Sequence, residues 1–541
     1  MPVAGLSLLS ADRSVPVLEH TVGDALRVAA DAWGDRVALQ EGSAAPGVRR
    51  WTFATLLVEA TQTARALSRY FAPGEHVAIC AANCPEWVLV EFGAALAGLV
   101  LVTANPASTA EELAYVLRQS KVRGVVVQRE FRGRNLRDMV EHIRPQLPEI
   151  REVISLDEWS AFLADGQLGA ALPKVTADHV AQIQYTSGTT GFPKGAMLTH
   201  RGLTNNGRFY ARAIGAGHED VWVNPMPMFH TAGCGLATLG ALQTGGCQVL
   251  AAGAEPGLLL DLIESRRATL MLCVPTMLIR VLDHPDAAKK DLSSWRACTS
   301  GGAPVPPEVV RRAQKELGIQ VAIGYGQTEA SPYLTHTLLD DPNADWMTTV
   351  GRPLPQTELK IVAPESDEVL PLGSVGEIAA RGYGIMRGYF DNEPATNAAL
   401  TTDGWLRTGD LGSIDELGYL RIQGRLKDMI IRGGENVFPR EIEDVLFTHP
   451  GIANVAVAGL PDKQWGEIVA AFVQPRPGAE LTAAELEAFC RQHLSSFKIP
   501  RRWHLVQHFP QTASGKVQKF VLRDQALAGA FAEFDGAKEV E

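Results

Sequence analysis

The fold class is decided by the segments HVAIC (76–80), PEWVLVEFGAALAG (85–98) and VRGVVVQ (122–128). The first and last are short apolar runs of the kind found in buried strands, and the middle one has the length of a helix. Strands that alternate with helices favour a parallel sheet covered by helices. We therefore predict an α/β fold, in which the apolar run 92–103 is a packed helix that leads into a buried strand.

Two further patterns extend this prediction along the chain. A helix is expected to begin at Ser108, because Ser108 and Glu111 have the spacing of a capping box, which satisfies free amides at a helix start. A second unit of strand, helix and strand is predicted between 248–250 and 270–274, with its helix beginning near Pro256. Both patterns are consistent with the same α/β architecture.

The pattern changes after about Gly424, where strands and helices become more closely spaced. KDMIIRGGENV (427–437) indicates a strand and a turn, and Pro439 suits the first position of the next helix. Thr482 and Glu485 indicate the start of another helix. We predict a large domain at 1–426 and a small α+β domain at 427–541.

Composition restricts the class of protein. The chain has 541 residues and a formal net charge of −11, so a basic surface for nucleic acid is not expected. Neither a secretory signal nor an apolar run of the roughly 20 residues that a membrane span requires is predicted. The seven cysteines are scattered without a CxxC pair, which favours reduced thiols and a cytoplasmic location. A homodimer is expected from base rates alone.

The segment TSGTTGFPKG (186–195) follows an apolar run, HVAQIQY, that is predicted to be a strand. Glycines allow the backbone amides to approach an anion, hydroxyls add donors, and the lysine adds positive charge. The segment therefore predicts a phosphate-binding loop. It is not a Walker A motif, because Gly195 stands where that motif needs Ser or Thr. The predicted loop residues are Thr186, Ser187, Gly188, Thr189, Thr190, Gly191, Phe192, Pro193 and Lys194.

This segment resembles the phosphate-loop signature of the adenylate-forming superfamily, which contains acyl-CoA synthetases, peptide-synthetase adenylation domains and luciferases. Six further segments match that family in its order: PMFHTAG (227–233), SGGAP (300–304), GYGQTE (324–329), TGDL (408–411), GRLKDMIIRGGENVFPREIE (424–443) and SGKVQK (514–519). The resemblance implies parallel sheets flanked by helices with a small β-barrel subdomain, followed by a small mobile α+β domain. It also implies ATP, Mg²⁺ and coenzyme A.

The resemblance assigns roles to residues whose chemistry suits them. Tyr325 would stack on adenine. Thr328 would donate to the α-phosphate, and Glu329 would bind Mg²⁺, a cation that prefers oxygen ligands beside substrate phosphates. Asp410 would accept hydrogen bonds from the ribose hydroxyls, with Arg425 beside it.

Further residues are assigned in the same way. Lys516 would be the adenylation lysine, stabilising charge that builds up as the carboxylate attacks the α-phosphate; Lys519 is a weaker alternative. Lys427 occupies the position about which the small domain pivots between the two half-reactions. Gly433 and Gly434 would then approach the pantetheine arm of CoA, although a plain turn at a strand end also explains them.

The acid substrate is less closely defined by the resemblance. His230 is placed at the junction of the acyl pocket and the thiol tunnel. Gly301 is counted with the nucleotide-binding residues and also with the small pocket residues Thr231, Gly233, Cys234, Gly235 and Gly324. Medium-chain fatty acids are predicted, with aryl acids as the alternative. Two other activities stay open: an enzyme that stops at the adenylate or loads a carrier protein, and a nucleotide sensor without turnover.

Overall fold

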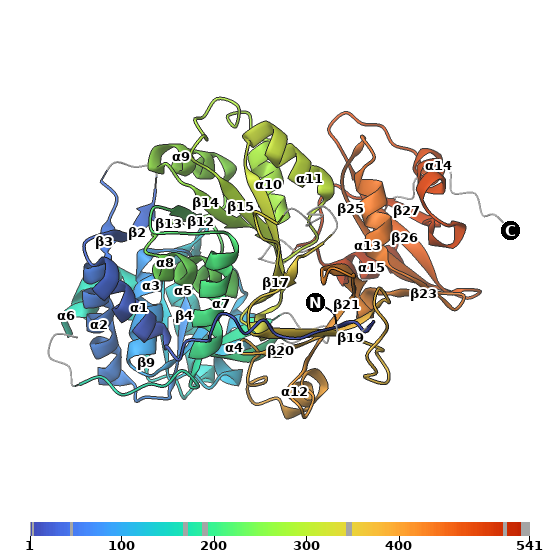
Figure 1. Cartoon of the computed structure of the whole chain (residues 1–541). Helices are drawn as coiled ribbons and strands as arrows, with labels where there is room; N and C mark the ends of the chain where they lie inside the picture. The colour runs from blue at the N-terminus through green and yellow to red at the C-terminus, as the bar shows by residue number, and fades with distance from the viewer. Residues whose placement is uncertain are drawn as a thin grey trace.

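The computed structural model describes residues 2, 5–43, 47–165, 171–186, 193–341, 349–511 and 517–531. Within them lie two large sheets, a smaller antiparallel sheet and a C-terminal mixed sheet (Figure 1). None of the described helices is long and apolar enough to cross a membrane.

The first large sheet has the strand order β11-β10-β5-β4-β6-β9. Its strands are β4 (His76–Cys80), β5 (Val100–Ala104), β6 (Gly124–Val127), β9 (Glu152–Ser155), β10 (Val180–Thr186) and β11 (Lys194–Thr199). All pairs are parallel except β10 with β11. The helices of this part of the chain are α1 (Val22–Trp33), α2 (Phe53–Tyr70), α3 (Pro85–Leu96), α4 (Ala110–Gln119), α5 (Leu136–Ile143) and α6 (Trp159–Asp165).

This sheet confirms the strand and helix alternation predicted for 76–128. Every residue of α3 is buried, and so is every residue of β5. The predicted cap of α4 is wrong by one residue: the side chain of Thr109, not Ser108, accepts from the helix start, and Glu112, not Glu111, completes the box. Ser108 belongs to the preceding turn, in which its amide donates to the carbonyl of Asn105 at 3.1 Å.

The second large sheet has the order β18-β17-β16-β15-β14-β12-β13-β2-β3 and is parallel from β16 to β2. Its strands are β2 (Val37–Gly42), β3 (Arg50–Thr52), β12 (Val221–Asn224), β13 (Cys247–Ala251), β14 (Leu270–Cys273), β15 (Ala297–Gly301), β16 (Gln320–Gly326), β17 (Tyr333–His336) and β18 (Arg352–Pro353). Associated with it are α7 (His200–Ala213), a π-helical segment (Ala232–Thr238), α8 (Leu239–Thr244), α9 (Pro256–Arg266), α10 (Pro275–Leu282) and α11 (Pro307–Arg312).

The helix predicted to begin near Pro256 is α9, with Pro256 as its first residue.

The third sheet has the order β1-β19-β20-β21-β22 and is antiparallel. It consists of β1 (Leu8–Leu9), β19 (Thr357–Val362), β20 (Gly376–Gly382), β21 (Leu406–Ile414) and β22 (Leu420–Arg425), with α12 (Glu393–Ala399) between β20 and β21. The resemblance implies a small β-barrel subdomain in the large domain. In the described residues the pairing runs from β1 to β22 without a further pair that joins these two edge strands.

The C-terminal sheet contains β23 (Ile430–Arg432), β24 (Glu435–Val437), β25 (Ile452–Asp462), β26 (Gly466–Pro475) and β27 (Arg502–Leu505). It lies at one side of the molecule with α13 (Pro439–Phe447), α14 (Ala483–His493) and α15 (Lys519–Leu527), drawn orange to red in Figure 1. Pro439 opens α13, and the hydroxyl of Thr482 caps α14, both as predicted. The boundary between 426 and 427 stays a prediction.

Candidate active site

The predicted phosphate loop joins two adjacent strands. Thr186 is the last residue of β10 and Lys194 is the first of β11, and the two are direct partners in the antiparallel pair. The carbonyl of Pro193 accepts a hydrogen bond from the hydroxyl of Tyr115 at 3.2 Å. Residues Ser187, Gly188, Thr189, Thr190, Gly191 and Phe192 lie outside the described residues. The structure therefore places the two ends of the loop side by side, at one end of the first large sheet.

Glu329, the predicted Mg²⁺ ligand, lies close to this loop base. It belongs to a short 3₁₀ turn, Thr328–Ala330, that follows β16, and both Thr328 and Glu329 are buried. The Glu329 side chain accepts a hydrogen bond from the Thr186 hydroxyl at 3.4 Å. Two predicted site residues that are 143 positions apart in the sequence are thus in contact.

Tyr389 is a site residue that the sequence did not identify. Its hydroxyl donates to Oε1 of Glu329 at 2.7 Å, and its ring centroid lies 4.6 Å from Nζ of Lys194. Burial and the adjacent Glu329 carboxylate raise the pKa of Tyr389. No local pattern marks this tyrosine, because both of its partners come from distant elements.

The predicted adenosine-binding residues form a second contact group. The Tyr325 hydroxyl donates to Oδ2 of Asp410 at 2.8 Å, and Nε of Arg425 lies 3.3 Å from Oδ1. Asp410 and Arg425 are direct partners between β21 and β22. Burial and the nearby Asp410 carboxylate raise the pKa of Tyr325. The structure therefore brings all three residues together.

Gly301 and Gly324 lie at the carboxyl ends of the paired strands β15 and β16. A Cβ at Gly301 would be 2.8 Å from the Tyr333 hydroxyl, and a Cβ at Gly324 would be 2.4 Å from the Tyr333 ring. Both glycines are therefore needed for close packing against Tyr333. A tyrosine side chain thus lies beside both glycines, and their assignment to the acyl pocket stays a prediction.

His230 precedes the π-helical segment Ala232–Thr238. Its Nδ1 accepts from the amide of Ala232 at 3.2 Å, and its carbonyl accepts from the amides of Gly233 and Cys234. Because Nδ1 is occupied as an acceptor, this nitrogen is not a free base in the structure. The residue orients the start of the π-helical segment.

A buried polar network lies beside His230. Gln184 Nε2 donates to Cys234 Sγ at 3.2 Å and to Gln182 Oε1 at 2.7 Å, and Gln182 Nε2 donates to Glu91 Oε1 at 2.8 Å. Burial raises the pKa of Glu91 well above its usual range, and burial also raises the pKa of the Cys234 thiol. The Cys234 side chain is thus engaged in this network, although it was expected in the acyl pocket.

The predicted pivot and the double glycine lie in the C-terminal region. Lys427 is in a 3₁₀ turn, Leu426–Asp428, that directly follows β22. Gly433 and Gly434 have φ values of 60° and 88° and form the turn between β23 and β24. Positive φ at both central residues is typical of a tight hairpin turn, which favours glycine. This geometry explains both glycines as parts of a plain turn at a strand end, which is the alternative to a role beside the pantetheine arm.

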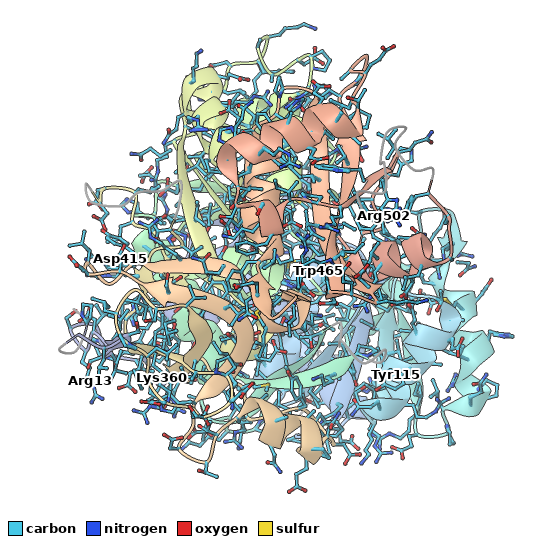
Figure 2. The ribbon with its side chains drawn as sticks, turned by 90° about the vertical axis from the view of Figure 1, so that its right-hand side faces the viewer. Arg13, Tyr115, Lys360, Asp415, Trp465 and Arg502 are labelled. Atoms are coloured by element: carbon cyan, nitrogen blue, oxygen red, sulfur yellow. The ribbon has the colours of Figure 1, made fainter. Side chains whose placement is uncertain are left out.

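The tryptophan beside this turn is labelled in Figure 2. The carbonyl of Trp465 accepts from the amide of Gly433 at 2.8 Å, and a Cβ at Gly433 would be 2.7 Å from the Trp465 ring. The guanidinium of Arg432 lies over the same ring. The turn is therefore held against a rigid aromatic side chain.

The adenylation lysine, Lys516, lies outside the described residues. Lys519, the weaker alternative, is the first residue of α15, and its Nζ lies 2.6 Å from Oε1 of Glu443 on α13. Glu443 also accepts from the amide of Val457 at 2.7 Å. This ion pair gives Lys519 a role in joining α15 to the C-terminal sheet, which disfavours it as the mobile catalytic lysine.

The described residues contain no group of three or more His, Cys, Asp or Glu side chains that could hold a metal ion. A single buried carboxylate, Glu329, beside the phosphate-loop base fits a Mg²⁺ ion that arrives with ATP, because such ions take one or two carboxylates and complete their shell with phosphates and water. It does not fit a metal held by protein ligands alone.

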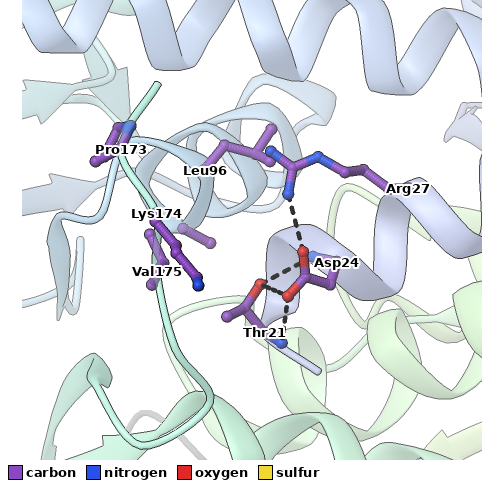
Figure 3. Close-up of a pocket in the computed structure, with 8 residues that line it drawn as sticks. Thr21, Asp24, Arg27, Leu96, Pro173, Lys174 and Val175 are labelled. Carbon is purple, nitrogen blue, oxygen red and sulfur yellow. Dashed lines mark hydrogen bonds and ion pairs between the residues drawn. The ribbon is translucent and has the colours of Figure 1, made fainter. Parts of the chain in front are cut away.

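A cavity of about 230 Å³ lies elsewhere, at the start of α1 (Figure 3). It is lined by Thr21, Asp24, Arg27, Ala95, Leu96, Pro173, Lys174 and Val175. Arg27 and Thr21 are both hydrogen-bonded to Asp24, so these three polar side chains satisfy one another in the cavity wall. None of the predicted site residues lines this cavity.

Two family models match the chain. The model described as AMP-binding enzyme matches residues 26–390, and the model described as AMP-binding enzyme C-terminal domain matches residues 441–516. Together they cover the segments that carry the predicted site residues, except for those between 391 and 440 and for Lys519.

Named relatives and solved structures agree with these models. The chain is 38% identical to the putative acyl-CoA synthetase YngI of Bacillus subtilis (strain 168), over 94% of this chain and 98% of the relative. It is 35% identical to the mitochondrial medium-chain acyl-CoA ligase ACSF2 of Danio rerio, over 97% and 91%. The crystal structure of the anthranilate CoA ligase AuaEII with anthranoyl-AMP matches with a TM-score of 0.87 and 26% identity, covering 95% of this chain and 99% of that one.

Proposed function

Because the chain belongs to the AMP-binding enzyme family and is an AMP-forming acid–CoA ligase, we propose that its acid substrate is a medium-chain fatty acid. The observation that carries this proposal is the 35% identity, over 97% of the chain, to a relative named medium-chain acyl-CoA ligase. The apolar cluster around Tyr333, which includes Phe209, Ala232, Leu236 and Val274, supports an uncharged substrate tail.

The overall reaction has two steps. The acid carboxylate attacks the α-phosphorus of ATP, which forms the acyl-adenylate and releases pyrophosphate. The thiol of CoA then attacks the acyl carbonyl, which forms the thioester and releases AMP. Both steps use one acyl-adenylate, so the site must bind the same adenosine group throughout.

In this proposal the residues at the base of the phosphate loop, Thr186, Lys194 and Glu329, form a first contact group that binds the phosphates. Lys194 and the loop that begins at Thr186 attract the β- and γ-phosphates, and Thr328 donates to the α-phosphate. Glu329 would hold Mg²⁺, which supplies positive charge to the triphosphate when bound. The contact of Glu329 with Thr186 supports this assignment, because it places the carboxylate at the loop base.

The second contact group would bind adenosine. Asp410 would accept from the ribose hydroxyls with Arg425 beside it, and the Tyr325 ring would face adenine. The contacts of Tyr325 and Arg425 with the two oxygens of Asp410 support a fixed carboxylate. Gly301 is assigned to the same region, since it is paired with Gly324, the residue before Tyr325.

The remaining assignments concern the acyl group and the change between half-reactions. His230 would lie at the junction of acid and thiol, Lys516 would stabilise the adenylation transition state, and Lys427 would be the pivot. Gly433 and Gly434 would approach the pantetheine. We also propose a cytoplasmic location, which the seven free cysteines support.

An aryl acid is the second candidate, because the structure of a ligase named for anthranilate resembles this one. The experiment that separates them is pyrophosphate release with saturated fatty acids from butyrate to palmitate, and with benzoate and cinnamate, each with and without CoA. Release that is highest with octanoate or decanoate supports the proposal, and release only with aromatic acids overturns it. Release without a CoA-thioester product would instead indicate transfer to a carrier protein.

A further inference from the structure

We propose that Tyr389 is a positioning residue for adenylation, in which its hydroxyl orients the Glu329 carboxylate and its ring holds the Lys194 ammonium. One side chain would then set the spacing between a metal-binding oxygen and a phosphate-binding cation. The inference rests on the proposed function, because it takes the roles of Glu329 and Lys194 from there. Tyr389 itself need not touch the substrate.

The hydroxyl fixes one oxygen of the carboxylate. Oε1 of Glu329 accepts from the Tyr389 hydroxyl at 2.7 Å and from the Thr186 hydroxyl at 3.4 Å. Within the described part of the chain, Oε2 accepts no hydrogen bond. Glu329 and Tyr389 are 8% and 7% exposed, so their hydrogen bond lies in a poorly hydrated place where a bond to a charged acceptor is strong. The carboxylate is thus held by one oxygen while the other is left for a cation.

The ring acts on the second partner. Nζ of Lys194 lies 4.6 Å from the ring centroid, within the range of a cation–π interaction. Among the described residues no carboxylate forms an ion pair with Lys194. The ammonium is therefore held by an uncharged surface, so its full charge is kept for an incoming phosphate.

The backbone of Tyr389 is attached to the strand that carries Lys194. The amide of Phe390 donates to the carbonyl of Gly195 at 2.8 Å, and the amide of Met197 donates to the carbonyl of Gly388 at 2.9 Å. The amide of Tyr389 donates to the hydroxyl of Thr396 at 2.9 Å. The backbone of Tyr389 is thus fixed relative to the strand of Lys194, and the hydrogen bond to Glu329 holds the side chain, which is what a positioning residue requires.

Two substitutions separate the two contacts. Tyr389→Phe removes the hydroxyl and keeps the ring, whereas Tyr389→Leu removes both. The readout is direct binding: Mn²⁺ titrated into each protein with α,β-methylene-ATP and followed by electron paramagnetic resonance, and the same analogue titrated without metal by calorimetry. Tyr383→Phe is the matched control, because its hydroxyl accepts from Asn206 at 3.2 Å, away from Glu329.

We expect Tyr389→Phe to weaken Mn²⁺ binding about tenfold, the effect of losing a hydrogen bond to a charged group, while metal-free analogue binding stays at the wild-type value. Tyr389→Leu should also weaken metal-free binding, by about threefold. Tyr383→Phe should bind Mn²⁺ like the wild type. Wild-type Mn²⁺ binding by Tyr389→Phe, or an equal loss in Tyr383→Phe, would overturn the inference.

The variant Glu329→Gln distinguishes a failure of this inference from a failure of the proposed function. If Glu329→Gln loses Mn²⁺ binding and Tyr389→Phe does not, only the role of Tyr389 is wrong. If Glu329→Gln binds Mn²⁺ like the wild type, the metal role of Glu329 is wrong and the inference falls with it. Tyr389→Phe differs by one oxygen atom, and thermal unfolding of each variant confirms that the fold is retained.

Discussion

The hydroxyl of Tyr325 donates to Oδ2 of Asp410 at 2.8 Å, although the two residues are 85 positions apart and belong to different sheets. Tyr325 lies in the second large sheet and Asp410 in the antiparallel sheet. The bond therefore links the antiparallel sheet to the second large sheet at the proposed ribose site.

Replacing Tyr325 by Phe should raise the KM for ATP about tenfold, because it removes a hydrogen bond to a carboxylate and leaves the ring for adenine. The kcat at saturating ATP should change much less. Steady-state kinetics with 2′-deoxy-ATP gives the sharper check, since the penalty of the substitution should shrink when a ribose hydroxyl is missing. The control is Tyr419→Phe, whose hydroxyl donates to Asp341 at 2.6 Å instead. An equal rise in both variants would contradict the assigned role.

Replacing Lys516 by Ala should slow adenylation by about 10² to 10³ fold, because a charge that stabilises one transition state is lost. Thioester formation from supplied acyl-adenylate should stay near the wild-type rate. Lys519→Ala is the contrast: it breaks the ion pair with Glu443 and should lower stability rather than the adenylation rate selectively. Rapid-quench measurement of each half-reaction decides, and an equal loss of both in Lys516→Ala would count against the role.

Replacing Lys427 by Pro should leave adenylate formation intact and stall transfer to CoA. Proline fixes φ near −65° at the turn that follows β22, and so restricts the torsion proposed for the pivot. Lys427→Asp should keep both steps, since the demand is on the backbone. Single-turnover transfer at the wild-type rate in Lys427→Pro would place the pivot elsewhere.

Replacing Glu91 by Gln should make stability less dependent on pH. The folded pKa of Glu91 is raised by burial, so the unfolded state loses its proton first, and stability falls as pH rises from the usual glutamate range toward the folded pKa. Relative to the wild type, the free energy of unfolding of the variant should therefore rise by about 1.4 kcal/mol per pH unit across that window. Urea unfolding midpoints at several pH values from 5 to about 8 measure the difference.

Glu41→Gln provides a control of opposite sign for that experiment. The hydrogen bond from Arg49 lowers the pKa of Glu41, so its stabilising effect is present above the unfolded pKa and is lost as pH falls through the folded one. This variant should be less stable than the wild type at neutral pH. A pH profile for Glu91→Gln that parallels the wild type would show that Glu91 is ionised in the folded protein.

The sequence predicted the sheets better than it predicted exact contacts. Apolar runs such as 76–80 and 122–128 are read from local pattern alone, and both form strands. The cap of α4 was misplaced because Ser108–Glu111 and Thr109–Glu112 have the same spacing, and only the turn at Asn105 decides between them. Where two overlapping residue pairs have the same capping spacing, the spacing alone does not show which residue is the cap.

The site shows the same limit. The strand before the phosphate loop is predicted from the apolar run 179–185, but its partner β11 is not, so the pairing of Thr186 with Lys194 does not follow from the sequence. The packing of Tyr333 against Gly301 and Gly324 does not follow, because it depends on β17 folding back beside β16. Tyr389 reaches Glu329 across 60 positions, a distance at which spacing carries no information.

The buried chain from Glu91 through Gln182 and Gln184 to Cys234 crosses from α3 and β10 to the π-helical segment beside the other large sheet. Asn83 makes a second link, since its amide donates to the carbonyls of Met226 and Ala251. Sliding one sheet past the other would leave these buried polar groups without hydrogen-bond partners, which costs free energy. The two sheets are thus expected to move as one rigid body. Any segment that changes position between the half-reactions has to be found among those that these links leave out.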